Sequence, residues 1–190
     1  MKRILITLAF GAVLSTSSFA VNLLSNAGFE SGGLGPWFQA RDFGGPENWN
    51  VTGTDFNSGA FSATDVGNKE LRQDFAPTLT SLITEISVWI KNPDTQINFI
   101  SFHYSDFTEG GQLVSARSAS WEHYDVTSSL DAGKTLVGIG LWGYLGGSAA
   151  EDRSFYDDAV VNSSVPEPAT MAVLGLGVAA LLRRRRQAQK

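Results

Sequence analysis

Side chains suited to acid–base or nucleophilic catalysis are scarce in this chain of 190 residues, because it has no cysteine and only two histidines, His103 and His123. Ser101, His103 and Asp106 could be drawn as a catalytic triad. However, alternate residues of one strand point the same way, whereas a triad needs a nucleophile, a base and an orienting group in line. Neither a Gly-x-Ser-x-Gly elbow nor a His-Glu-x-x-His metal motif occurs. We therefore expect structural histidines and no enzymatic activity, although spacing alone does not exclude the carboxylate pair of a secreted glycoside-active enzyme.

Aromatic side chains form the second group with chemical potential, because flat rings can stack on the C–H faces of sugars. In residues 82–91 the apolar residues share one face of an alternating pattern, and Trp89 lies on the other face among polar neighbours. An outward-facing Trp is less expected than a buried one. Trp89 is therefore our first candidate for ligand binding, followed by Tyr104, Trp142 and Tyr144. The alternative is that each of them fills a core between two sheets.

The charge distribution is uneven. Between residues 22 and 165 the chain has seven basic and 18 acidic residues, a net charge of −11, whereas the other basic residues cluster at the two ends. An acidic body argues against nucleic-acid binding, which needs a basic surface. It is compatible with cation binding or with solubility alone. The absence of cysteine excludes disulfides and cysteine-ligated metals.

The first 20 residues have the organisation of a secretory signal peptide. Met1-Lys2-Arg3 is basic, residues 4–14 are apolar, and Ser18-Phe19-Ala20 fits the small-x-small rule before a cleavage site. We predict removal of residues 1–20 by cleavage after Ala20. An uncleaved anchor helix would need a longer apolar run.

The last segment, residues 163–190, has three parts in a fixed order. Pro166, Glu167 and Pro168 are followed by an apolar run over residues 169–182 and then by a basic cluster. That cluster consists of Arg183, Arg184, Arg185 and Arg186. The run is shorter than the roughly 20 residues of an ordinary transmembrane helix, but arginines that snorkel extend it and keep its basic end in the cytoplasm.

This order resembles the PEP-CTERM sorting signal of Gram-negative bacteria. The resemblance implies that an exosortase, a membrane-embedded processing enzyme, recognises the tail and cleaves it near Pro-Glu-Pro. The tail would then be a transient transmembrane helix of the inner membrane, and the body would reach the cell surface or the medium. An ordinary C-terminal anchor is the alternative.

Residues 21–162 are predicted to form one β-rich domain. Expected strands are separated by turns such as Asn92-Pro93-Asp94, and no segment has a long helical period with caps. Many short strands of this kind predict an all-β sandwich or barrel. The strands expected in the second half are 82–91, 96–104, 112–116, 121–127, 135–142 and 154–161.

Several patterns in this domain resemble the jelly rolls of carbohydrate-binding modules, in the galactose-binding-like superfamily. They are residues 22–30 as a first strand, then Trp37 and Trp49, 58–63, 71–75, 121–127 and 155–160. The resemblance implies a jelly-roll β-sandwich. In similar modules, a Glu of the first strand and an Asp of the last strand help to hold a structural calcium ion.

The positions that correspond to those calcium ligands are Glu30 and Asp157, with Asp158 as the alternative. Ca²⁺ takes roughly six to eight oxygens, so backbone carbonyls and a further carboxylate, such as Asp55 or Asp65, would have to contribute. The alternative is that Asp157 and Asp158 are solvated acids without an ion.

Together, the tail and the module resemblance imply an exported surface or matrix protein that binds carbohydrate non-catalytically, with the producer's exopolysaccharide as the expected partner. The alternative is a structural matrix or floc protein with no sugar ligand. A concave groove lined with exposed aromatic side chains would favour the sugar-binding hypothesis.

Overall fold

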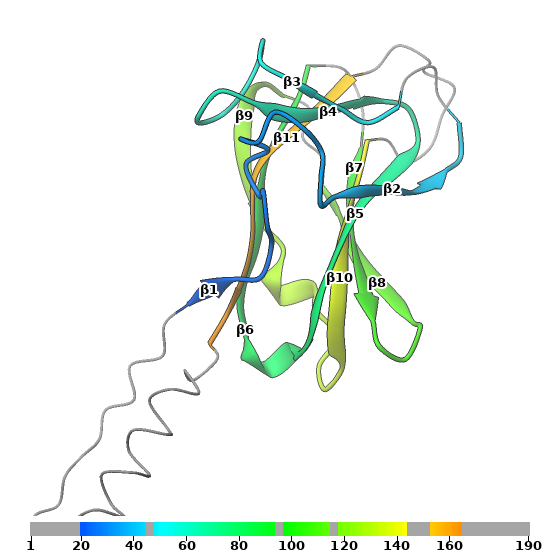
Figure 1. Ribbon diagram of the computed structural model, residues 1–190. Coiled ribbons are helices and arrows are strands. Elements are labelled where there is room, and N and C mark those ends of the chain that lie inside the picture. Colours follow the sequence, from blue (N-terminus) through cyan, green and yellow to red (C-terminus); the bar gives the residue numbers. More distant parts are fainter. Residues whose placement is uncertain (1–19, 45–47, 94–96, 115–117, 144–152, 165–190) are drawn as a thin grey trace, which may run out of the picture. The chain divides into compact units, whose positions relative to one another are not determined.

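The computed structural model describes residues 20–44, 48–93, 97–114, 118–143 and 153–164 (Figure 1). Ala20–Val165 form one compact unit. None of the helices within the described ranges combines the length and apolar character that crossing a bilayer requires. Residues 1–19 and the sorting tail from 165 onward, with Pro166, Glu167, Pro168 and the four arginines, lie outside the described residues, as does Tyr144.

Strands and two short 3-10 helices make up the regular structure of the described residues. They are β1 Val21–Asn22, β2 Phe38–Asp42, β3 Asn50–Thr52, β4 Ser62–Val66, β5 Lys69–Leu79, η1 Thr80–Leu82, β6 Ile83–Asn92, β7 Asn98–Tyr104, β8 Glu109–Val114, β9 Ser118–Asp125, η2 Thr127–Ser129, β10 Thr135–Trp142 and β11 Arg153–Ser163.

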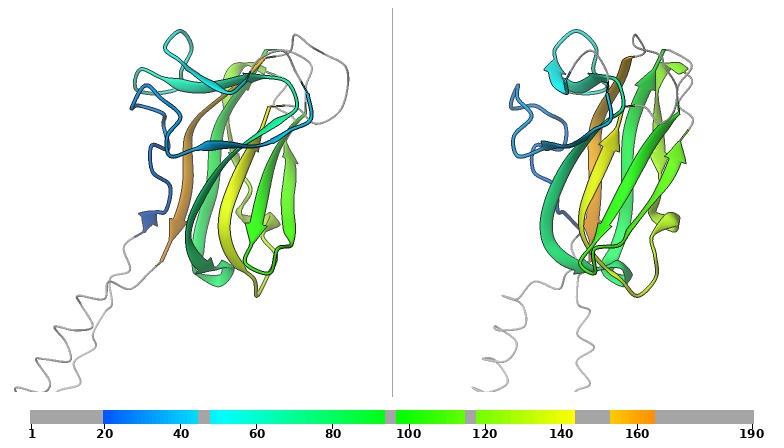
Figure 2. Two further views of the ribbon diagram at one scale, coloured as in Figure 1. Left: turned by 45° about the vertical axis from the view of Figure 1, so that its right-hand side comes forward. Right: turned by 90° about the vertical axis from the view of Figure 1, so that its right-hand side faces the viewer.

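The strands form two antiparallel sheets that face each other (Figure 2). The six-stranded sheet has the order β3-β4-β11-β6-β9, and β1 pairs with β11. The five-stranded sheet has the order β2-β5-β10-β7-β8. This arrangement confirms the predicted all-β sandwich.

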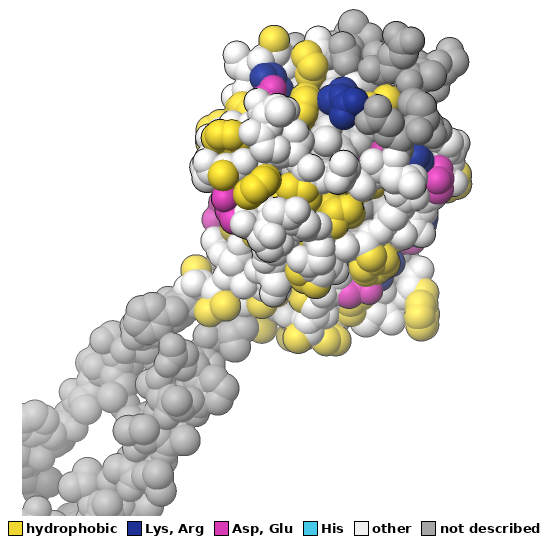
Figure 3. All heavy atoms as spheres, turned by 45° about the horizontal axis from the view of Figure 1, so that its top comes forward, with side chains coloured by type: hydrophobic (Ala, Val, Ile, Leu, Met, Phe, Trp, Pro, Cys, Tyr) yellow, Lys and Arg dark blue, Asp and Glu magenta, His cyan; other side chains and the backbone are white. Residues whose placement is uncertain are grey.

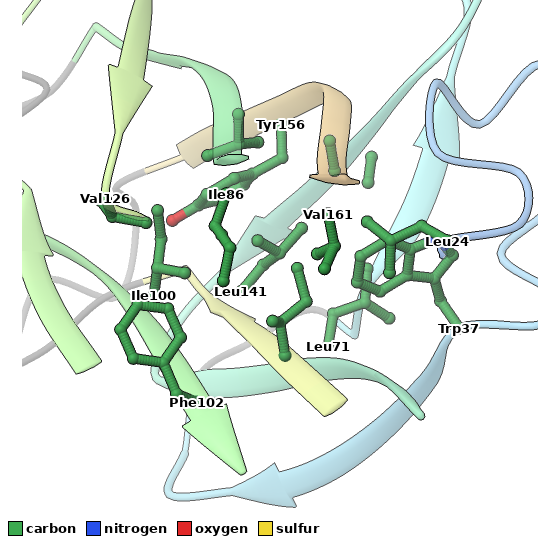
Figure 4. Close-up of a cluster of buried hydrophobic side chains, with 14 of the residues drawn as sticks. Leu24, Trp37, Leu71, Ile86, Ile100, Phe102, Val126, Leu141, Tyr156 and Val161 are labelled. Carbon is green, nitrogen blue, oxygen red and sulfur yellow. The ribbon is translucent and has the colours of Figure 1, made fainter. Parts of the chain in front are cut away.

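The core lies between the two sheets and follows from strand alternation (Figure 4). Ile86 and Val161 of the six-stranded sheet face Leu71, Phe102 and Leu141 of the five-stranded sheet. Successive side chains of a strand point to opposite faces, so each second residue is directed out of the sandwich. The outward residues of each sheet are therefore free to form a site.

The start of the domain differs from the prediction. Residues 22–30 were expected to form one strand, but only Val21–Asn22 pair with β11. Asn26 and Phe29 have positive φ angles of 50° and 58°, which no strand accommodates. The Asn26 side chain stabilises the resulting turn by donating to the carbonyl oxygen of Gly33 at 2.8 Å and accepting from the Ser31 N–H. Asn tolerates this conformation because its short polar side chain can bond locally.

Candidate functional site

Polar side chains gather on the outer face of the five-stranded sheet. Glu70 and Arg72 of β5 alternate with the core residue Leu71, and Ser101 and His103 of β7 alternate with core residues in the same way. Between these strands lies β10, which pairs with both. Its Gly140 has no side chain, and a Cβ there would overlap Glu70 Oε1 and Ser101 Oγ. Glycine on the central strand thus lets the flanking polar groups meet above it.

Glu70 is the centre of this cluster and is fully buried. Its Oε1 accepts hydrogen bonds from Ser101 Oγ and from His103 Nε2, both at 2.6 Å. Burial raises the pKa of Glu70, but the hydrogen bonds from His103 and Ser101 outweigh it, so the pKa lies below its ordinary value. Oε2 has no hydrogen-bond partner among the described residues and lies 3.6 Å from Arg41 Nε. We therefore place a buried negative charge beneath Arg41.

The hydrogen bonds of His103 determine its tautomer. Arg72 Nη1 lies 3.1 Å from His103 Nδ1, and a guanidinium can only donate, so Nδ1 accepts. Nε2 donates to Glu70 Oε1, since a carboxylate oxygen that also binds Ser101 acts as the acceptor. Asp106 is not part of this cluster, because its carboxylate accepts from Thr108. The triad that could be drawn from the sequence is thus not formed.

Two arginines on this face are matched by carboxylates. Arg41 of β2 donates through both terminal nitrogens to Glu109 of β8, with Nη1 to Oε2 at 2.8 Å. The hydrogen bond from Arg41 lowers the pKa of Glu109, and the same contact raises the pKa of Arg41. Arg72 Nε lies 2.5 Å from Asp74 Oδ1. The face thus presents donors and acceptors side by side, with little excess charge.

An aromatic stack lies beside these ion pairs. Phe43 follows β2 and stacks on Trp142 of β10, with ring centroids 5.7 Å apart and an interplanar angle of 7°. Trp142 is only 4% exposed, whereas Phe43 is 68% exposed. The Arg41 guanidinium lies 6.0 Å from the Trp142 ring, and Trp142 Nε1 donates to Ser101 Oγ at 3.1 Å. Trp142 therefore supports this surface from beneath, and Phe43 is its accessible ring.

A cavity of about 350 Å³ opens on the same sheet near the β7–β8 turn. Its walls are formed by charged side chains of the polar cluster on one side and by residues of the β7–β8 turn on the other. Its lining residues are Arg72, His103, Tyr104, Ser105, Phe107, Thr108, Glu109 and Val137.

The aromatic residues singled out in the sequence lie in three places. Trp89 faces outward from the six-stranded sheet, as its alternation predicts, with its ring centroid 5.2 Å from that of His123. Trp142 belongs to the other sheet. Tyr104 is 3% exposed, packs in the core and accepts the Asp131 N–H at its hydroxyl, although it also lines the cavity. These three residues do not form one platform.

The three carboxylates of the predicted calcium site converge on one loop, residues 57–61. Asp157 Oδ2 accepts the backbone N–H groups of Asn57 and Ser58 at 2.8 and 3.1 Å. Asp158 accepts from the side chains of the same two residues, both at 2.9 Å. Glu30 accepts the backbone N–H groups that follow in this loop. Burial, together with the neighbouring charge of Asp158, raises the pKa of Asp157 to about 6.

The additional carboxylates that were expected for calcium lie elsewhere. Asp55 binds Lys91 Nζ at 2.6 Å and the Trp121 indole at 3.2 Å. Asp65 lies on β4 close to Gly143. In the described part of the chain, no three His, Cys, Asp or Glu side chains surround a common point at metal-binding distances.

Sequence reasoning missed Glu70, Arg41, Phe43 and Glu109. A signal was present in β5, where charged residues alternate with Leu71 and Gln73. The strand β2 gave no comparable signal, because only five residues form it and three of them are exposed.

Comparison with known proteins gives two findings. The PEP-CTERM protein-sorting motif matches residues 164–186. TmCBM61, solved in complex with β-1,4-galactotriose, superposes with a TM-score of 0.53 at 18% identity, covering 74% of this chain and 97% of its own. Another solved structure, the family 16 carbohydrate-binding module 2, gives a TM-score of 0.54 at 15% identity, covering 73% of this chain and 98% of its own.

The fold also occurs within a larger protein. The enzymatically active domain of bacteriophage CBA120 tailspike protein 4 gives a TM-score of 0.52 at 11% identity, covering 76% of this chain and 21% of its own. No curated protein matches the sequence. At these identities the structures share the fold alone. The chain is thus an exported protein that carries a PEP-CTERM motif for exosortase sorting behind a β-sandwich with the fold of carbohydrate-binding modules.

Proposed function

We propose that the body binds a glycan, without altering it chemically, through the outer face of the five-stranded sheet. The observation that carries this proposal is the exposed Phe43 ring, stacked on Trp142 and adjacent to the Arg41–Glu109 ion pair. An aromatic ring can cover the C–H face of a sugar, while paired charged groups exchange hydrogen bonds with its hydroxyls. TmCBM61, which shares the fold, was solved with a galactose trisaccharide.

The chemistry of the cluster supports binding rather than cleavage. Glycoside hydrolysis needs a carboxylic acid that remains protonated until it reaches the leaving-group oxygen. Glu70 and Glu109 both have lowered pKa values and are ionised at neutral pH. His103 cannot take the proton of Ser101, because Nε2 donates to Glu70 and Nδ1 is engaged by Arg72.

The sorting tail is consistent with an extracellular location, where glycan binding would be useful. A body that is exported and processed by an exosortase system would meet the polysaccharides that surround the producing cell. We therefore propose the producer's own exopolysaccharide as the glycan partner. We also propose that the protein stays transiently in the inner membrane before it is released.

The test is retardation of the protein in native gels that contain β-1,4-galactan or the producer's exopolysaccharide. We expect Phe43→Ala to weaken binding by about tenfold, the size of one lost stacking contact. Phe56→Ala is the matched control, because Phe56 is 41% exposed and lies outside the five-stranded sheet. Trp89→Ala tests the outer face of the other sheet.

Each outcome has a distinct meaning. Unchanged retardation of a folded Phe43→Ala variant would reject the proposed face, and a loss in Trp89→Ala alone would move the site to the six-stranded sheet. Absence of retardation of the unmodified protein in both gels would contradict glycan binding and favour the structural matrix or floc protein.

We also propose that Glu30, Asp157 and Asp158 move together to hold a structural Ca²⁺ ion, since they do not surround a common point in this structure. The support is their convergence on residues 57–61 and the like charges of Asp157 and Asp158 at a partly buried position, which a cation would offset. Each carboxylate accepts protein hydrogen bonds, but its two oxygens have about four acceptor sites, so coordination remains open to them. The ion would stabilise the loop against β11.

Calcium addition should raise the melting temperature of chelator-treated protein, because an ion that binds only the folded state stabilises it. Magnesium is the control, since it favours smaller, more rigid sites. We expect the Asp157→Asn variant to lose the calcium-dependent shift. Equal melting temperatures with calcium and with chelator would contradict the proposal.

A further inference from the structure

The two ends of the folded body lie side by side. Val21 of β1 pairs with Ser163 at the end of β11. Ser164 then donates its backbone N–H to the Leu82 carbonyl of η1 at 2.8 Å. The sorting motif begins at residue 164, so the fold continues directly up to it. A membrane or enzyme that binds the tail therefore also keeps this end of the sandwich close to itself.

Several turns form this end together with η1 (Figures 1 and 2). The Thr80 N–H bonds the Lys134 carbonyl and the Ser105 N–H bonds the Thr135 carbonyl, both at 2.9 Å. A cavity of about 230 Å³ is lined jointly by η1, η2 and the turn 131–134. We call the surface of η1, η2 and the turns 105–108 and 131–134 the tail-side end.

The tail-side end and the residues next to it present exposed apolar side chains. Phe107 in the turn 105–108 is 98% exposed, the highest value among the exposed large hydrophobic residues of the described chain. Leu79, next to η1, and Val21 are about half exposed. Figure 3, in which the top of Figure 1 comes forward, shows hydrophobic side chains interspersed among polar and charged ones on that face of the body.

The few charges of the tail-side end largely cancel. Lys134 Nζ lies 3.7 Å from Asp106 and 3.3 Å from Asp131, and neither η1 nor η2 contains a charged residue. The body as a whole carries seven basic and 18 acidic residues between 22 and 165. The tail-side end itself has two acidic residues and one basic residue, so its net charge of −1 gives an anionic leaflet little to repel.

The length of the connection limits how far this end can be from a membrane. Four residues, 165–168, separate Ser164 from the apolar run that starts at Ala169. Fully extended, four residues span at most about 14 Å. The headgroup layer on one side of a bilayer is itself about 5–7 Å thick. A tail embedded in the bilayer thus keeps Ser164, at the edge of the tail-side end, within about 10 Å of the headgroup layer.

We infer that the tail-side end is a lipid-docking surface, in which Phe107 and Leu79 contact the headgroup region for as long as the tail is attached. This inference rests on the proposed residence of the tail in the membrane. A few exposed side chains bury less apolar area than a single acyl chain, which itself binds membranes only marginally. The contact therefore depends on the tail, and cleavage near residue 166 would release the body.

Fluorescence quenching can test this with the chain that retains its tail, reconstituted into phosphatidylcholine vesicles. The protein has no cysteine, so a single introduced cysteine carries the dye without background. Ala132→Cys places the dye in the turn 131–134, and Ala119→Cys is the matched control, since both alanines are exposed and Ala119 lies toward the opposite end of the six-stranded sheet. We expect headgroup-located spin-labelled lipid to quench the dye at residue 132 strongly and at residue 119 weakly.

A second variant, Phe107→Ser, should reduce the quenching at residue 132, because it removes the most exposed apolar side chain of this surface. Flotation of the vesicles distinguishes a failure of the membrane-residence proposal from a failure of the lipid-docking proposal. Protein that does not float with the vesicles would contradict the membrane residence of the tail. Protein that floats but is quenched equally at residues 132 and 119 would overturn the lipid-docking surface alone.

Discussion

Glu70→Ala is expected to lower the free energy of unfolding by about 3–5 kcal/mol, because it leaves buried polar groups without their acceptor. The Ser101 hydroxyl and the His103 Nε2–H both donate to Glu70 Oε1 at 2.6 Å, and all three residues are buried. Urea denaturation followed by tryptophan fluorescence measures the loss. Glu70→Gln keeps the acceptor and should cost less, while Glu85→Ala, at a half-buried glutamate of the other sheet, should cost less still. Equal stability of Glu70→Ala and Glu85→Ala would contradict the central role of Glu70.

The same residue should make stability depend on pH. The pKa of Glu70 in the folded state is lower than the ordinary glutamate pKa of about 4.3. The ionised side chain therefore stabilises the folded state fully at pH values above that ordinary pKa. That contribution is lost as the pH falls through the lower, folded-state pKa. The unmodified protein should thus lose stability in acid more steeply than Glu70→Gln, in which residue 70 no longer titrates. Parallel pH profiles for the two proteins would argue against this assignment.

Gly140→Ala should be the most damaging glycine substitution on the candidate site. A Cβ at residue 140 would overlap Glu70 Oε1 and Ser101 Oγ, which are held in place by their own hydrogen bonds. Overpacking of this kind costs roughly 1–3 kcal/mol, and displacing Glu70 adds the loss of its buried contacts. We expect a lower melting temperature together with weaker glycan retardation.

Gly33→Ala is the matched control for this substitution, because nothing lies within 4 Å of the added Cβ. It should leave both melting temperature and retardation nearly unchanged. Combining Gly140→Ala with Ser101→Ala should recover part of the stability, since one of the two overlapping atoms is removed. A Gly140→Ala protein as stable as Gly33→Ala would show that the site does not need the bare backbone of β10.

Local periodicity was sufficient to predict much of the fold. The strand expected at 135–142 coincides with β10, and the expected 82–91 differs from β6 by one residue at each end. These strands alternate clearly because one face of each is buried. The predicted first strand failed because Asn26 and Phe29 take left-handed conformations that a composition pattern does not reveal.

The candidate site was less accessible to sequence reasoning, because its parts come together only across the sheet. Glu70 and His103 are 33 residues apart, and they meet because β5 and β7 flank the glycines of β10. Trp142 was singled out from the sequence as an aromatic of interest. That Phe43 would cover it could not be seen, since Phe43 is placed by the end of β2, a strand that was not predicted.

The sequence by itself determined the sorting motif, since such a motif is a short linear segment with its apolar and basic parts in order. It also determined the β-sandwich, through strand alternation and turns. Only the tertiary structure decided which outward residues share a face, which aromatic rings are accessible and which carboxylates meet. The physical reason is that strand pairing joins residues tens of positions apart, and their burial and charge depend on neighbours that no local pattern specifies.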